Sequence, residues 1–139
     1  MAKAKLGGPL RIDWTALVRA ARDARKRAWA PYSHFPVGAA IVGESGRIYV
    51  GCNVENSSYG LTVCAERNAI GAAVVAGEKR IVAVAIAAGA RPCPPCGMCR
   101  QVLAEFGGPQ TPVALLGGRR RWVHQLGELL PHAFDRSYL

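Results

Sequence analysis

The sequence has few acidic residues, no long apolar run and no apolar segment near its start. Its 139 residues include 9 Asp and Glu against 18 Lys and Arg, a formal net charge of +9. The longest apolar stretch, residues 81–90, is about half as long as the roughly 20 residues that cross a bilayer. Residues 1–8 lack the apolar run of a secretion signal. These absences exclude a membrane-spanning segment and predict a cytoplasmic protein.

The excess of positive charge has two interpretations. A strongly basic chain can bind nucleic acid or polyphosphate. The basic residues gather in two short clusters, at 19–27 and 119–121, and neither contains interleaved aromatic residues. A solvated basic surface is therefore the favoured interpretation, and we expect no nucleic-acid partner.

The chain has the length and composition of one folded domain. Half of its residues are hydrophobic and 19% are charged, which is typical of globular proteins. We predict a flexible basic tail over residues 1–12 and a single domain over residues 13–139. The five cysteines are an odd number without a secretion signal, which favours metal binding over a disulfide framework.

The periodicity of the apolar residues predicts helices that alternate with strands. Asp13 is suited to cap the first helix. Three helices and a final helical turn are expected at residues 13–29, 63–76, 98–106 and 128–130. Five strands are expected at residues 36–42, 47–54, 80–88, 113–116 and 121–124. This order predicts the α/β class, with a three-layer α/β/α sandwich around a mixed sheet of about five strands.

Two overlapping C-x-x-C pairs occupy residues 93–96 and 96–99. A zinc knuckle needs backbone N–H groups that face the sulfurs, and Pro94 and Pro95 have none. Gly97 in the second pair gives the backbone the freedom to bend. The second pair also opens a predicted helix, whose dipole favours thiolates. Cys96 and Cys99 are therefore the favoured zinc ligands.

Cys64 opens another predicted helix upstream and is the candidate third ligand. Three protein ligands leave the fourth position of zinc open, as in catalytic sites. Glu66 follows two residues later, close enough to shuttle protons without binding the metal. Two alternatives remain open. Cys64 can be a buried core residue, and Cys96 and Cys99 can form a structural site with Cys93.

These residues resemble a known family. Cys64-Ala65-Glu66-Arg67 and residues 95–101 (PCGMCRQ) are similar to the small, homotetrameric cytidine deaminases, in the three-cysteine form of the deaminase signature. Three further segments resemble family motifs, at residues 31–40 (PYSHFPVGAA), 51–56 (GCNVEN) and 129–134. The similarity covers roughly residues 13–134. Cys93 and Pro94 depart from the family pattern and place a spare thiol beside the site.

The resemblance implies a cytidine deaminase-like fold and a role for each matching residue. Cys64, Cys96 and Cys99 would bind one zinc ion per chain, with zinc-bound water as the nucleophile. Glu66 would be the general acid and base, and Arg67 would hydrogen-bond the ligand sulfurs. The implied substrate contacts are Phe35 on the pyrimidine ring, Asn53 and Glu55 on the ribose, the backbone of Ala65 on the base, and Tyr59 and Phe134 in the pocket of a neighbouring subunit.

The implied activity is hydrolytic deamination of cytidine and deoxycytidine, with release of ammonia, in pyrimidine salvage by a homotetramer. A deaminase of a cytosine nucleoside antibiotic such as blasticidin S shares the metal signature and is the main alternative. Residues 53–56 (NVEN) and Arg67 favour cytidine. An editing deaminase would use the positive charge, but the short chain argues against it. A non-enzymatic zinc module would not need Glu66.

Overall fold

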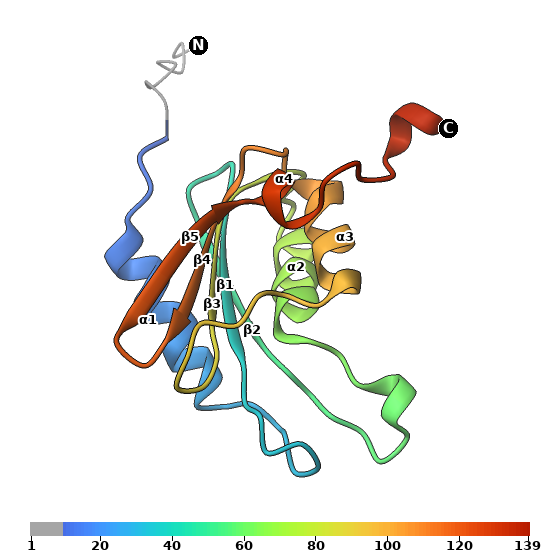
Figure 1. Cartoon of the computed structure of the whole chain (residues 1–139). Coiled ribbons are helices and arrows are strands. Elements are labelled where there is room, and N and C mark those ends of the chain that lie inside the picture. The colour runs from blue at the N-terminus through green and yellow to red at the C-terminus, as the bar shows by residue number, and fades with distance from the viewer. Residues whose placement is uncertain (1–9) are drawn as a thin grey trace.

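A five-stranded mixed sheet separates two layers of helices in residues 10–139, the part of the chain that the computed structural model describes (Figure 1). The strands are β1 (Gly38–Gly43), β2 (Ile48–Cys52), β3 (Ile81–Ala87), β4 (Pro112–Gly117) and β5 (Arg120–Gln125). Their order across the sheet is β2-β1-β3-β4-β5. β3 and β4 run parallel, and the other neighbouring strands pair antiparallel.

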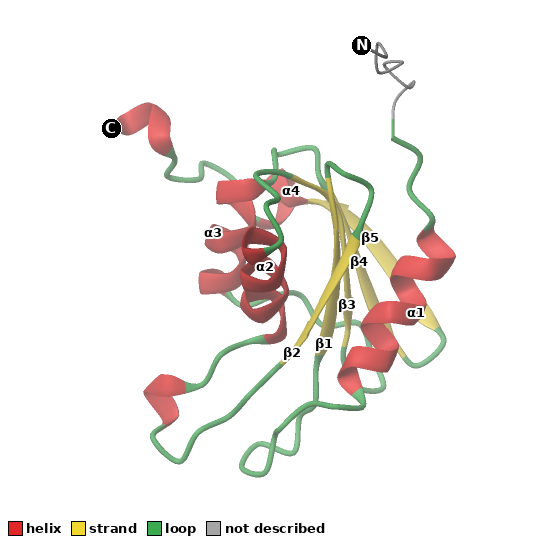
Figure 2. Ribbon diagram, turned by 180° about the vertical axis from the view of Figure 1, so that it is seen from behind, coloured by secondary structure: helices red, strands yellow, loops and turns green. Residues whose placement is uncertain are grey.

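Helices cover both faces of this sheet (Figure 2). The longer ones are α1 (Trp14–Arg25), α2 (Ala65–Val75) and α3 (Gly97–Phe106), followed by the single turn α4 (Leu126–Leu129). Two short 3₁₀ helices are η1 (Tyr59–Leu61) and η2 (Arg136–Tyr138). α1 lies on one face, and α2 and α3 lie on the other. The predicted three-layer α/β/α sandwich and mixed five-stranded sheet are confirmed.

The two faces of β3 belong to two separate cores. Ala83 and Ala85 are buried with Leu17 and Ala21 of α1. On the other face, Val84 and Ile86 are buried in a second cluster with side chains of α2 and α3. Burial on both faces explains why the sequence of this strand is a nearly continuous apolar run.

The first helix begins as predicted but ends earlier. The Asp13 side chain accepts a hydrogen bond from the Ala16 amide at 3.0 Å, so Asp13 is the N-cap. The helix ends at Arg25 rather than at Trp29. Trp29 instead donates its amide to the Asn53 carbonyl at 3.0 Å and accepts from the Glu55 amide at 2.8 Å. This pairing with the chain after β2 takes the backbone groups that a longer helix would use.

The sheet register brings three connecting segments together at one end of the strands. Gly38, the first residue of β1, lies opposite Cys52 at the end of β2 and opposite Ala87 at the end of β3. The segment before β1 and the segments after β2 and β3 therefore meet at the same end of the sheet. The segments after β2 and β3 lead into α2 and α3, and the first residues of both helices lie at this end of the sheet.

The predicted N-terminal tail falls mainly on residues 1–9, which lie outside the described residues. Ile12, within the predicted tail, is half-buried against the core beneath α1. Across residues 10–139, no helix combines the length and apolar character needed to cross a membrane.

Candidate active site

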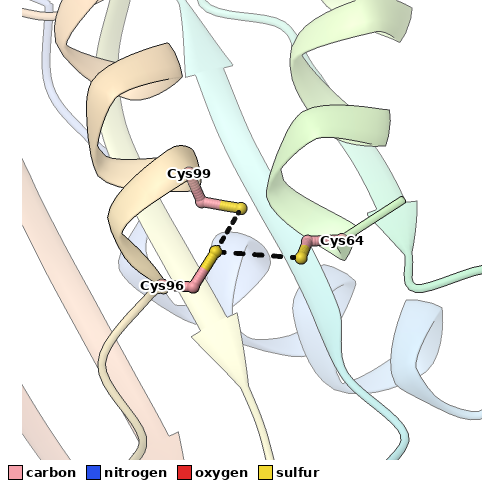
Figure 3. Close-up of side chains that lie close together, drawn as sticks. All are labelled: Cys64, Cys96 and Cys99. Carbon is pink, nitrogen blue, oxygen red and sulfur yellow. Dashed lines mark hydrogen bonds between the residues drawn. The ribbon is translucent and has the colours of Figure 1, made fainter. Parts of the chain in front are cut away.

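Three thiols converge where α2 and α3 begin (Figure 3). Cys64 is the N-cap of α2, Cys96 is the N-cap of α3, and Cys99 lies in the first turn of α3. The Cys64 and Cys96 sulfurs are 3.9 Å apart, and those of Cys96 and Cys99 are 3.4 Å apart. The three Sγ atoms all lie within 4.8 Å of one another.

The geometry of this cluster fits a tetrahedral zinc ion. Zn–S bonds of about 2.3 Å at tetrahedral angles place the sulfurs about 3.8 Å apart, close to the spacings found. Cys93 is outside the cluster, and its thiol faces the Pro94 carbonyl at 3.5 Å. The structure thus brings together the second C-x-x-C pair and Cys64 as three candidate ligands.

Hydrogen bonding lowers the pKa of the Cys64 thiol. The hydrogen bond with Cys99, followed by those with Arg67 and Cys96, lowers the pKa of Cys64 to about 5. The same interaction with Cys64 raises the pKa of Cys99 above the ordinary thiol range, and burial adds to this effect. The lowered pKa favours the thiolate of Cys64, the form that binds zinc.

Arg67 supplies the cation beside the thiols. Its Nη2 lies 3.7 Å from the Cys64 sulfur and donates to the Thr62 carbonyl at 3.2 Å. Its Nε is buried and has no hydrogen-bond partner within the described chain. The guanidinium is thus placed to offset the negative charge of the sulfurs, and the role that the resemblance implies for Arg67 stays a prediction.

Glu66 lies in the first turn of α2 and is only 5% exposed. Burial raises the pKa of its carboxyl, and the neighbouring charge of Cys64 raises it further. A raised pKa brings proton uptake nearer to neutral pH, where a group that both accepts and donates protons works best.

A cavity of about 260 Å³ joins Glu66 to the polar end of the site. Its lining comes mainly from the segment before β1, the segments after β2 and β3, and the start of α2. The predicted site residues that line it are Phe35, Asn53, Glu55, Cys64, Ala65, Glu66 and Cys96. Cys99 is fully buried behind the other two thiols. The cavity thus runs from the metal ligands to the residues predicted to contact ribose.

Asn53 fixes the wall that carries Phe35. Its side-chain oxygen accepts from the Val37 amide at 2.8 Å, and its side-chain nitrogen donates to the Phe35 carbonyl at 2.9 Å. An amide group has two acceptor and two donor positions, so one of each remains free. Asn53 can therefore hold the wall of the cavity and still bind a hydroxyl group.

Glu55 is held as a carboxylate by the segment before β1. It accepts from the amides of Tyr32 at 2.9 Å and Ser33 at 3.1 Å, and from the Ser33 hydroxyl. These bonds, the one from the Ser33 hydroxyl first, lower the pKa of Glu55. A carboxylate has about four acceptor positions, so one remains for a ligand.

Tyr59 and Phe134 lie outside the main cavity. Tyr59 belongs to η1, is 74% exposed, and lines an adjoining cavity with Tyr32. Phe134 follows α4, is 58% exposed, and stacks on Tyr138 with ring centroids 5.6 Å apart. Both aromatic rings are therefore available to contact another molecule.

Sequence reasoning gave no role to several residues that form this site. Ser33 and Thr62 line the cavity, and Ser33 also binds Glu55. Cys93, expected to be a bystander thiol, lines the cavity although it is outside the metal cluster. The predicted segment at residues 31–40 contains Ser33, but only the tertiary pairing of distant segments indicates its contact with Glu55.

Comparisons with known proteins agree with this geometry. Residues 13–115 match the family model described as the cytidine and deoxycytidylate deaminase zinc-binding region. A cytidine deaminase of Sporosarcina psychrophila is 44% identical over 130 residues, which cover 92% of this chain and 96% of the relative. The crystal structure of a cytidine deaminase from Burkholderia pseudomallei aligns with a TM-score of 0.84 at 46% identity, covering 88% of this chain and all of the other. A cytidine deaminase from Mycobacterium tuberculosis aligns with a TM-score of 0.78 at 44% identity, over 90% of this chain and 99% of the other. The chain therefore belongs to the cytidine deaminase family.

Proposed function

We propose that this chain hydrolyses cytidine and deoxycytidine to uridine and deoxyuridine, with release of ammonia. The observation that carries the proposal is the single cavity that joins the thiol cluster and Glu66 to Asn53 and Glu55. One end holds a metal site beside a buried acid, and the other offers acceptors for sugar hydroxyls. Family membership supports the same activity.

Cys64, Cys96 and Cys99 would hold the zinc ion. Zinc with an open coordination position acts as a Lewis acid that makes water a nucleophile near neutral pH. Three thiolate ligands would reduce this acidity because they would donate charge to the metal. Arg67, beside the Cys64 sulfur, withdraws part of that charge and so counteracts the effect.

Glu66 moves the protons. Its carboxylate takes a proton from the attacking water and passes it to the ring nitrogen of the pyrimidine. A C–O bond then forms at the ring carbon that carries the amino group, and the C–N bond breaks. Glu66 carries the second proton of the added water from the new hydroxyl to the amino group, which departs as ammonia and leaves the uracil ring. The raised pKa of Glu66 fits a group that must be protonated and deprotonated in each cycle.

The rest of the cavity orients the nucleoside. Phe35 packs on the pyrimidine ring, and the backbone of Ala65, at the start of α2, faces the base. The free acceptor and donor positions of Asn53 and the free acceptor position of Glu55 bind the sugar hydroxyls. Since these two residues also fix the segment before β1, they set the position of Phe35 relative to the sugar.

The active unit is a homotetramer in which neighbouring subunits complete each site. Tyr59 and Phe134 project from the body of the subunit and are exposed, as expected of side chains that enter a neighbouring pocket. The enzyme works in pyrimidine salvage in the cytoplasm, on a small nucleoside, without nucleic-acid or membrane partners.

The direct test is the loss of ultraviolet absorbance when zinc-loaded protein is mixed with cytidine. We expect conversion of cytidine and deoxycytidine, and no conversion of blasticidin S or of cytosine in a single-stranded oligonucleotide run in parallel. An enzyme that leaves cytidine intact would refute the proposal, and preferential turnover of blasticidin S would assign it a different substrate.

A further inference from the structure

Arg100 connects the metal-binding segment to the C-terminal part of the chain. It lies in α3, immediately after Cys99, and its guanidinium is half-buried. Its Nε donates to the Pro95 carbonyl at 2.7 Å, and its Nη1 donates to the Leu129 carbonyl at 2.6 Å. Pro95 is the residue before Cys96, and Leu129 is the last residue of α4. One side chain therefore bridges two segments that are 34 positions apart.

Both acceptors are backbone carbonyls in need of a partner. Pro95 is buried and precedes the helix that Cys96 caps, so its carbonyl direction helps to set the position of the Cys96 sulfur. α4 has a single turn, closed by the Leu130 amide on the Leu126 carbonyl at 2.9 Å. The Leu129 carbonyl is one of the groups left unpaired at a helix C-terminus, where a cation is favourable.

The next residue extends the same connection. Gln101 donates its side-chain amide to the Phe134 carbonyl at 2.8 Å. Arg100 and Gln101 thus attach two points of the C-terminal segment to the first half of α3, the helix that carries Cys96 and Cys99. Phe134 is the residue assigned above to a neighbouring pocket.

We propose that Arg100 is a positioning residue that couples zinc binding to the placement of the C-terminal segment. By holding the Pro95 carbonyl it keeps the Cys96 sulfur aligned with those of Cys64 and Cys99. Because the same guanidinium binds the Leu129 carbonyl, it also holds α4 and the residues after it in position relative to the Cys96 segment. The proposal rests on the zinc site inferred above.

The planar guanidinium is required for this role. Its N–H groups point in fixed, different directions, so two carbonyls can be bound at once. A lysine ammonium has the same charge but cannot reproduce the fork that binds both acceptors. Arg100→Lys therefore separates the effect of charge from that of the bridge.

The first test is the zinc affinity of variants, measured by competition with a chromophoric chelator. Removal of groups that orient metal ligands typically weakens metal binding about 10- to 100-fold. We expect a loss in that range for Arg100→Gln and a smaller loss for Arg100→Lys. The matched control is Arg22→Gln. Arg22 lies in α1, on the other face of the sheet, and its guanidinium donates to the Gly118 carbonyl at 3.3 Å. Zinc affinity of Arg100→Gln within twofold of the unaltered protein would overturn the proposal.

A second measurement needs no variant. Hydrogen exchange of the Leu130 amide, which closes α4, is followed in the unaltered protein with and without zinc. We expect zinc to slow this exchange, because the metal fixes the segment that Arg100 holds. An unchanged rate would contradict the coupling.

Cys96→Ser distinguishes the coupling proposal from the proposed zinc site. If Cys96→Ser keeps full zinc affinity, the zinc site itself is wrong. If Cys96→Ser loses zinc affinity but Arg100→Gln does not, only the coupling is rejected.

Discussion

At the scale of single residues, the metal centre depends on which thiols face one another. Four of the five cysteines lie near the start of α2 or α3, yet only three sulfurs converge. Cys93 lines the cavity with its thiol directed to a carbonyl. The thiol cluster, rather than the number of cysteines, defines the ligand set.

Exchanging Cys93 for Ser should therefore leave the metal in place. We expect about one zinc ion per chain in Cys93→Ser after dialysis, and a loss of at least 100-fold in zinc affinity in Cys96→Ser, because two thiols bind zinc far more weakly than three. Elemental analysis of the dialysed proteins checks both. A Cys93→Ser protein without zinc would reverse the ligand assignment.

Glu78 is a buried carboxylate outside the active-site cavity, and its role is structural. It is 8% exposed and accepts hydrogen bonds from the Ser45 hydroxyl and from the Tyr49 hydroxyl, the latter at 3.0 Å. These bonds, the one from Ser45 first, lower the pKa of Glu78 below its ordinary value of 4.5. The folded state therefore favours the ionised form and is stabilised by it above that pH.

The stabilisation by Glu78 should depend on pH in one direction. Glu78→Gln should lower the Tm at pH 7, and the difference from the unaltered protein should shrink as the pH falls below about 4.5. Thermal unfolding followed by circular dichroism, on zinc-free protein at both pH values, measures this. A difference that stays constant with pH would show that shape rather than charge matters at this position.

At the scale of secondary-structure elements, the position of α2 is set by close contact with β2. A Cβ atom on Gly51 would overlap the Ala65 carbonyl and the Ala69 amide. The absence of a side chain lets α2 lie directly on the strand. Since Cys64 and Glu66 lie at the start of this helix, the contact also fixes the metal ligand and the proton carrier.

Two alanine substitutions of glycine should have opposite effects on stability. Gly51→Ala should lower the free energy of unfolding by about 1–3 kcal/mol through overpacking, and weaken zinc binding as α2 shifts. Gly71→Ala, on the exposed side of α2 with no atom near its Cβ position, should raise stability by about 0.5–1 kcal/mol. Urea denaturation compares the two. Equal stability of both variants would contradict the proposed contact.

The elements themselves could be predicted because local patterns determine them. The strand at residues 80–88 and the helix at 98–106 agree with β3 and α3 to within one residue at each end. η1 lies between the strand expected at 47–54 and the helix expected at 63–76, where no element was predicted, and it has no such local signal. The early end of α1 follows from the pairing of Trp29 with a distant segment.

The same distinction applies to the site. The convergence of Cys64 with Cys96 and Cys99 could be predicted because both motifs are short and lie at predicted helix starts, whereas the role of Glu66 stays a prediction. The bond between Ser33 and Glu55 spans 22 positions and follows from the sheet register. Contacts of that kind are tertiary, so residue type and spacing do not determine them.

At the scale of the whole molecule, the segments that extend from the layered body include two with exposed aromatic rings (Figures 1 and 2). One connects β2 to α2 and includes η1, and the other follows α4. They carry the exposed rings of Tyr59 and Phe134. The proposed assembly places these two rings in the pockets of neighbouring subunits.

The proposed assembly can be tested by complementation. Light scattering should give a mass about four times that of the 14.8 kDa chain. Phe134→Ala should be impaired because it leaves a neighbouring pocket incomplete, and Glu66→Gln should be inactive. Co-expression of the two should yield more activity than the sum of the separate variants, since mixed tetramers contain intact sites. Activity equal to the sum would place Phe134 outside the neighbouring site.

The measurement that tests the central claim most directly compares the unaltered protein with Glu66→Gln, with zinc content and cytidine turnover determined on the same samples. The unaltered protein should produce uridine and ammonia in equal amounts. Glu66→Gln should hold the same zinc and lose at least about 100-fold in kcat, because the proton carrier is gone while the thiols remain. Turnover by Glu66→Gln at the unaltered rate, or no turnover by the zinc-loaded unaltered protein, would contradict the proposed mechanism.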